Sequence, residues 1–139
     1  MLRITFAFAG LALLASCASA PQVSPAVRSE LAPTGKLRAA INFGNPTLAV
    51  KDPSGGEPRG VSVDLSRELA RRLGVPVELV TFNAAGKVVE ALKAKEVDVG
   101  FVAIDPARAV DISYSAAYVV IGGGYVVPQA SPVRANAEV

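Results

Sequence analysis

The sequence predicts an α/β fold with an open, mostly parallel sheet and flanking helices. Three observations lead to this class. Three short apolar, strand-like runs occur along the chain, two stretches of helical periodicity separate them, and the two kinds alternate. The strand-like runs are residues 36–43, 75–82 and 97–104, and the helical stretches are residues 61–73 and 86–95. A strand-helix-strand-helix-strand order makes the strands parallel and places crossover helices on the faces of the sheet.

The first strand is predicted at residues 36–43 (KLRAAINF), a mostly apolar run ahead of Gly44 and Pro46. Residues 47–50 are then predicted to be a short extended piece. Residues 52–56 (DPSGG) carry the residue types that reverse a chain, so we expect a surface hairpin or loop there.

The first crossover helix follows Gly60. Leu65, Leu69 and Leu73 recur at helical spacing, with charged residues on the other faces, which predicts an amphipathic helix with these leucines inward. Asp64 suits the positive end of the helix dipole. Gly74 is predicted to end the helix.

The second half of the pattern repeats the first. Residues 75–82 (VPVELVTF) alternate and are rich in β-branched types, as in a half-buried strand. A helix is predicted to open near Gly86 and to end at Lys93 and Lys95, where cations are favoured. Residues 97–104 (VDVGFVAI) form the third predicted strand. The apolar face of the second helix is predicted to consist of Ala85, Val88, Val89 and Leu92.

In open parallel sheets the ligand lies outside the carboxyl ends of the strands. Loops 43–46, 82–86 and 103–108 are therefore predicted to converge on one rim. Beyond them, the apolar run at residues 118–127 (YVVIGGGYVV) predicts a further strand with a flexible bend. No helix pattern or Lys-Ser/Thr follows its three glycines, which argues against a phosphate loop.

The first twenty residues are predicted to be a secretory leader. Arg3 gives a basic start, residues 4–14 are apolar, and small residues follow. Two cleavage sites compete: residues 18–20 (ASA) suit an ordinary signal peptidase, whereas residues 14–17 (LASC) resemble a lipoprotein box. We favour lipidation of Cys17, since a lipid there accounts for the lone cysteine of an exported chain. Residues 21–34 have no clear period and are predicted to be a tether.

Composition excludes several kinds of chemistry. The chain has 139 residues with 51% hydrophobic and 19% charged, which indicates one globular domain. It has no His, no Trp and one Cys, which removes the common zinc spacings, histidine-assisted nucleophiles and an internal disulfide. The 14 basic and 12 acidic residues are scattered, so no nucleic-acid footprint appears. We predict no metal site and no cofactor, while acid–base work by carboxylate, Lys or Tyr stays open.

Short motifs in a fixed order resemble the family 3 extracellular solute-binding proteins of amino-acid-type ABC importers, in their N-terminal part only. The resemblance spans residues 35–128. The motifs are GKLR (35–38), GVSVDL (60–65), LARRLGV (69–75), AL (91–92), VDVG (97–100), DPAR (105–108), YS (114–115) and Tyr118.

The resemblance implies a type 2 periplasmic binding fold, in which two lobes hold a small solute and an inner-membrane ABC permease reads their closure. Residues 35–128 would be the first lobe and residues 129–139 a truncated hinge-crossing segment, so the fold is expected to be incomplete. A lone lobe is not expected to bind by enclosure. The protein would be periplasmic, with contact to the membrane only through a lipid on Cys17.

The resemblance also implies the ligand contacts. Arg108 matches the arginine that grips an α-carboxylate, with a structural surface arginine as the alternative. Asn45 stands where relatives stack an aromatic ring, with Phe43 as a substitute, and Asp105 would repel a carboxylate unless it serves as a cap. The predicted contacts are Arg108, Asn45, Phe43, Phe101, Ala103 and Asp105, the two phenylalanines being equally explicable as core residues.

Three functions are therefore weighed. The leading one is the substrate-binding component of an ABC importer for an amino-acid-like solute, with no enzyme activity. The second is a periplasmic cyclohexadienyl or arogenate dehydratase, which needs an acid in the cleft and has only Asp105 or Asp111 near the rim. The third is a sensory or relic half-lobe that binds no solute.

Overall fold

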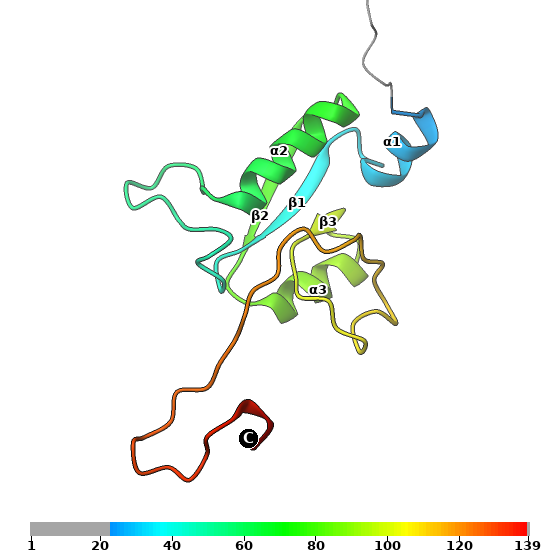
Figure 1. The fold of residues 1–139 in the computed structure, drawn as a ribbon. Coiled ribbons are helices and arrows are strands. Elements are labelled where there is room, and N and C mark those ends of the chain that lie inside the picture. Colours follow the sequence, from blue (N-terminus) through cyan, green and yellow to red (C-terminus); the bar gives the residue numbers. More distant parts are fainter. Residues whose placement is uncertain (1–22, 139) are drawn as a thin grey trace, which may run out of the picture.

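A small parallel sheet with one helix on each face forms the body of the protein (Figure 1), in a computed structural model that describes residues 23–138. The sheet has three strands in the order β2-β1-β3. The strands are β1 (Leu37–Asn42), β2 (Val77–Phe82) and β3 (Val99–Gly100), and the helices are α1 (Pro25–Leu31), α2 (Val61–Leu73), α3 (Ala85–Lys93) and the 3₁₀ turn η1 (Asn136–Glu138). The predicted open α/β class and its order of elements are confirmed.

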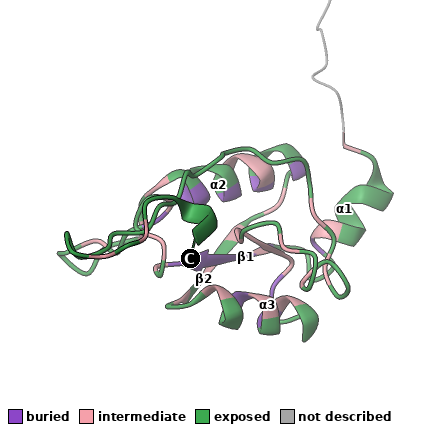
Figure 2. Cartoon of the chain, turned by 60° about the horizontal axis from the view of Figure 1, so that its bottom comes forward, coloured by how far each residue is buried: buried purple, intermediate pink, exposed green. Residues whose placement is uncertain are grey.

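The central strand β1 holds the layers together. Leu37, Ala39, Ala40 and Ile41 are completely buried. Because successive side chains of a strand point to opposite faces, Leu37 and Ile41 pack under α2, whereas Ala40 packs against α3. Figure 2 shows α2 and α3 on opposite sides of the sheet, with their buried residues turned toward it.

Helix α2 turns a different face inward from the one predicted. Its buried residues are Ser62, Val63, Ser66, Ala70 and Leu73. Leu65 is exposed, so the expectation that it points into the core is wrong, whereas Leu69 is half-buried and packs against the cluster of Leu37, Ala70 and Leu73. Small serines let the helix lie close to the sheet, and Ser66 satisfies its own hydroxyl by donating to the Ser62 carbonyl at 2.7 Å. Gly74 ends the helix in the left-handed conformation at φ 67°, as predicted.

Part of the predicted tether is a helix. Residues 25–31 form α1, which Ser24 caps by accepting a hydrogen bond from the Val27 amide at 3.3 Å, with Pro25 in the first turn. Leu31 packs against the cluster around Leu37, which fixes the helix to the body. The predicted leader and Cys17 lie outside the described residues.

The chain after β3 differs most from expectation. The third strand covers two residues instead of eight, since only Val99 and Gly100 pair with β1. Residues 118–127, predicted to be a strand, form no strand and stand largely in solvent. Figure 1 shows this segment leading away from the sheet toward the C-terminus. A strand needs a neighbour for its backbone groups, and this run has none within residues 23–138.

Candidate functional site

The ends of β1 and β2 bring two of the predicted rim loops together. The strands pair up to Asn42 and Phe82, and the Phe43 amide donates to the Phe82 carbonyl at 2.8 Å. The buried Asn42 side chain then accepts a hydrogen bond from the Gly44 amide at 2.9 Å and turns the chain. A Cβ on Gly44 would lie 2.8 Å from the Asn83 carbonyl, so this close approach of loops 43–46 and 82–86 requires glycine.

Two half-buried phenylalanines lie near the ends of the strands. Phe43 and Phe101 pack against the same buried cluster, which consists of Ile41, Ala49 and Val63. Each therefore has one side on the core and another open to its surroundings. The two readings of these residues, core and ligand contact, are both compatible with this position.

Each phenylalanine has a neighbouring side chain that contacts its ring. The Lys51 ammonium lies 5.2 Å from the centroid of the Phe43 ring, within the range of a cation–π contact. Tyr118 meets Phe101 edge to face, with ring centroids 6.0 Å apart and planes at 86°. Tyr118 belongs to the motifs quoted above, whereas no sequence signal indicated that Lys51 would fold over Phe43.

The loop after β3 gathers the charged residues of the predicted set. One Asp105 carboxylate oxygen accepts a hydrogen bond from the Ala107 amide at 2.8 Å, and its carbonyl accepts from the Arg108 amide at 3.1 Å. Asp105 thus caps the turn that begins at Pro106, the alternative role considered from the sequence.

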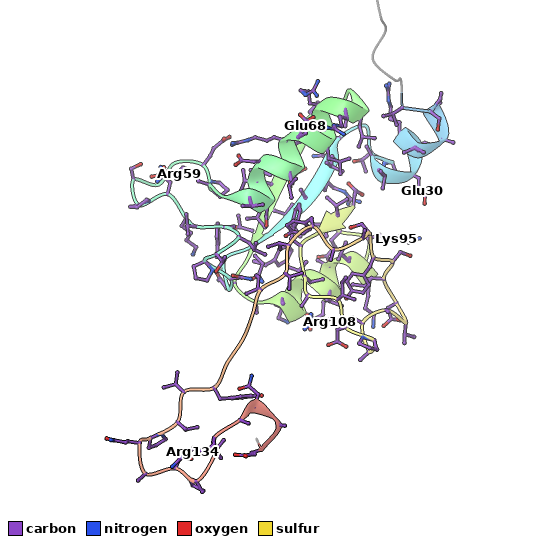
Figure 3. The ribbon with its side chains drawn as sticks, in the orientation of Figure 1. Glu30, Arg59, Glu68, Lys95, Arg108 and Arg134 are labelled. Carbon is purple, nitrogen blue, oxygen red and sulfur yellow. The ribbon has the colours of Figure 1, made fainter. Side chains whose placement is uncertain are left out.

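Arg108 is held only loosely in this loop. Its guanidinium donates to the Ala103 carbonyl at 3.3 Å and lies 3.8 Å from the second Asp105 oxygen. Tyr114 donates to the same carbonyl at 3.2 Å. Figure 3 shows Arg108 on the loop after β3, beside α3, while Arg134 lies far from the sheet in the C-terminal segment. A guanidinium has five N–H donors, so Arg108 retains several for a carboxylate.

The predicted contacts form two groups. Phe43 and Phe101 share one cluster, and Ala103, Asp105 and Arg108 share one loop. Asn45 turns into its own loop, where its side chain accepts a hydrogen bond from the Thr47 amide at 3.1 Å.

A groove of about 890 Å³ runs along β3, and of the six predicted contacts only Phe101 lines it. The other five predicted contacts lie outside this groove. That the six residues bind a ligand stays a prediction.

A separate ion pair fastens the opposite end of the sheet. Arg38 on β1 donates to Asp98 through its guanidinium at 2.6 and 3.1 Å and through its backbone amide at 2.8 Å. The hydrogen bonds that the Arg38 guanidinium donates to Asp98 raise the pKa of Arg38 above its ordinary value. Asp98 is 5% exposed and all these partners are internal, which indicates a structural role.

Three features of the described residues concern metal-binding groups, membrane-spanning helices and free acids. Within residues 23–138, no three His, Cys, Asp or Glu side chains are grouped so as to hold a metal ion. The same part of the chain has no helix of the length and hydrophobicity needed to cross a membrane. The two acids considered for catalysis are already engaged, since Asp111 pairs with Lys93 at 2.6 Å and Asp105 caps its turn.

Comparison with protein families gives one match over most of the chain. The model of the bacterial extracellular solute-binding proteins, family 3, matches residues 37–138. A search of the curated proteins finds no match.

Solved structures also resemble the chain. One is the arginine-bound form of domain 1 from the arginine-binding protein of T. maritima, in a single-substitution mutant. It has a TM-score of 0.60 and 28% identity over 70% of this chain and 75% of that domain. The others are an ancestral cyclohexadienyl dehydratase (TM-score 0.52, 28% identity, 60% of this chain and 34% of that one) and an ancestral cationic amino acid solute-binding protein (0.52, 29%, 60% and 37%). The chain thus spans about three quarters of the single domain but only about a third of the two ancestral proteins.

Proposed function

The chain belongs to the bacterial extracellular solute-binding proteins of family 3, and from this premise we propose that it binds an amino-acid-like solute for an ABC importer. The likeness to an arginine-bound domain 1 carries the proposal, because that structure is a single domain with an amino acid on it. It supports the idea that one lobe can bind a solute without a second lobe that encloses it. The solute would bind at the carboxyl ends of the strands.

The charged pair on the loop after β3 suits a zwitterion. The Arg108 contacts, at 3.3 and 3.8 Å, are long for hydrogen bonds and are easily exchanged for a bidentate pair with an α-carboxylate. The Asp105 oxygen that faces Arg108 can accept a hydrogen bond from the α-ammonium. Opposite charges side by side thus match the two charges of an amino acid.

The two phenylalanines supply the apolar part of the proposed site. Phe43 and Phe101 are half-buried and fixed by the cluster beneath them, so they offer a rigid surface to an aliphatic or aromatic side chain. Asn45 stays in the proposed set for its side-chain amide, in the loop after β1. Ala103 stays for its backbone carbonyl, in the loop after β3.

The first experiment is calorimetric titration of the purified protein with the common amino acids, followed by the Arg108→Ala variant. Loss of a charge-assisted hydrogen bond removes roughly 1.5–3 kcal/mol, so we expect affinity to fall about 10- to 100-fold. Arg71→Ala is the matched control, since Arg71 lies on the outer face of α2 and pairs with Glu68 at 2.7 Å. An Arg108→Ala variant that binds as tightly as this control would refute the carboxylate role.

A dehydratase function is the second candidate, favoured by the similarity to the ancestral cyclohexadienyl dehydratase. It requires a carboxylic acid free to protonate a leaving group, and both nearby acids are engaged in a cap or an ion pair. The assay is release of phenylpyruvate from prephenate. Turnover that is lost in Asp111→Asn would favour the enzyme over the importer component.

The third candidate, a half-lobe that binds no solute, would show no thermal stabilisation by any solute.

We also propose that the protein works outside the inner membrane, as its family description implies, and is anchored by a lipid on Cys17. Removal of the leader before Cys17 would leave residues 21–34 next to the membrane, residues 35–128 as the binding lobe and residues 129–139 as the start of a hinge crossing. The intact mass of the protein from its own cells tests this arrangement, because acylation at Cys17 adds a defined mass. A mature chain that starts after Ala20 would exclude the lipid.

A further inference from the structure

The loop that leads from β1 to α2 (Figure 1) carries a cation whose partner is an aromatic ring. The Lys51 ammonium lies 5.2 Å from the centroid of the Phe43 ring, which follows the last residue of β1. Among residues 23–138, no carboxylate lies at salt-bridge distance from this ammonium. The contact with the ring leaves the three N–H donors of the ammonium available to an acceptor.

The two acids of the same loop are engaged by other cations. The Arg59 guanidinium lies 3.6 Å from an Asp52 carboxylate oxygen. Glu57 pairs with Arg67 on α2. Asp52 is the direct neighbour of Lys51 in the sequence, yet its carboxylate is taken up by another side chain. The loop thus neutralises its own acids and leaves the Lys51 charge for a partner from outside the loop.

The backbone that carries Lys51 is fixed to the body of the protein. Ala49 is buried in the cluster against which Phe43 packs, and Val50 exchanges two backbone hydrogen bonds with Arg59, at 2.9 and 3.0 Å. Side chains alternate along an extended chain, so Lys51 lies on the same side as Ala49, whereas Val50 is exposed. The backbone therefore holds the Lys51 side chain toward the Phe43 ring, and only its flexible stem can move.

We propose that Lys51 makes the site select an amino acid with a carboxylate side chain, an inference that rests on the proposed function. The methylene groups of such a solute pack on the Phe43 ring, and its side-chain carboxylate accepts a charge-assisted hydrogen bond from the ammonium beside the ring. A cation–π contact at an exposed site is weak, so the carboxylate replaces the ring at little cost. A cationic side chain at the same place is repelled. Arg108 remains for the α-carboxylate.

The test is calorimetric titration of the full-length protein with L-glutamate and L-glutamine, which have the same size and differ in the charge of the side chain. We expect glutamate to bind roughly 10-fold more tightly, the effect of one charge-assisted hydrogen bond, and L-arginine to bind more weakly than either. Lys51→Gln should bind glutamate and glutamine equally. Lys36→Gln is the matched control, because it removes the same charge before β1, roughly 20 Å along the strand from Phe43, and it should keep the preference.

Three results would overturn the proposal. One is glutamine or arginine binding as tightly as glutamate to the unmodified protein. Another is a glutamate preference that Lys51→Gln retains, including a loss of affinity that is equal for both solutes, since the lysine would then contact a group that they share. The third is no binding of any amino acid, which contradicts the proposed function as well and is thereby distinguished from a wrong selectivity. Because Lys51 is exposed, its substitution is not expected to prevent folding.

Discussion

Replacing Gly60 with alanine is expected to destabilise the fold strongly, because this glycine joins the 44–59 loop to α2 in a conformation and a space that exclude a side chain. Its φ is 127° and its ψ 174°, a region that glycine alone adopts readily. A Cβ there would lie 2.5 Å from the Leu48 carbonyl oxygen and 2.9 Å from the Ala49 Cα. Both are backbone atoms, so no side chain can move aside to make room.

The cost follows from two contributions. The backbone conformation costs an alanine of order 1–3 kcal/mol. The forced shift of Leu48 also weakens the hydrogen bond that its carbonyl accepts from the Ser62 amide at 3.1 Å, which adds about 1 kcal/mol. The expected loss of unfolding free energy is therefore about 3 kcal/mol. Ala49 belongs to the cluster under Phe43, so solute affinity should fall as well.

Urea unfolding of Gly60→Ala beside Gly35→Ala measures the difference. Gly35 has a φ of 81°, but a Cβ on it would meet nothing within 4 Å. The control variant should therefore lose only about 1–2 kcal/mol, from the left-handed backbone alone. If the two variants unfold at the same urea concentration, the close contact with Leu48 has no energetic weight and the reasoning fails.

Two further predictions concern charged pairs. Hydrogen bonds from Arg71 and Arg72 lower the pKa of Glu68 from 4.5 to about 2. This carboxylate therefore stabilises the fold above pH 4.5, and the effect is lost as the pH falls toward 2. Glu68→Gln should make urea midpoints slightly less dependent on pH in that window, and high salt should remove the difference because the pair is exposed. Asp98→Asn leaves the part-buried Arg38 without its carboxylate and should lower the thermal midpoint well beyond the effect of Glu68→Gln; equal midpoints would contradict a structural role.

Local sequence patterns were sufficient to predict the order of strands and helices. They did not predict which residues of α2 are buried. Hydrophobic spacing indicated Leu65, Leu69 and Leu73. Leu73 is buried and Leu69 is half-buried, but Leu65 is exposed, and Ser62 and Ser66 are buried in its place. Serine becomes a good inward residue only when the helix lies close to a sheet and the hydroxyl bonds to the preceding turn. That closeness depends on the small Ala39 side chain of another element, so no window of sequence contains it.

The predicted strand lengths were wrong for a related reason. Residues 97–104 and 118–127 have strand-like composition, but a strand exists only where a neighbour accepts its backbone hydrogen bonds. The family resemblance indicated Arg108 and Phe43 for the predicted site, while the position of Lys51 over the Phe43 ring depends on how the intervening loop folds. Spacing along the chain carries no information about such contacts.

The central place of β1 has a consequence for the order in which the chain acquires structure. Leu37 pairs with Val77, and the ion pair to Asp98 closes over 60 residues. The strand synthesised first therefore has no partner until β2 has been made, and every sheet contact carries a high loop-closure cost. We expect refolding to be slow compared with helical proteins of this size, with α2 and α3 forming transiently before β1 is captured between its neighbours.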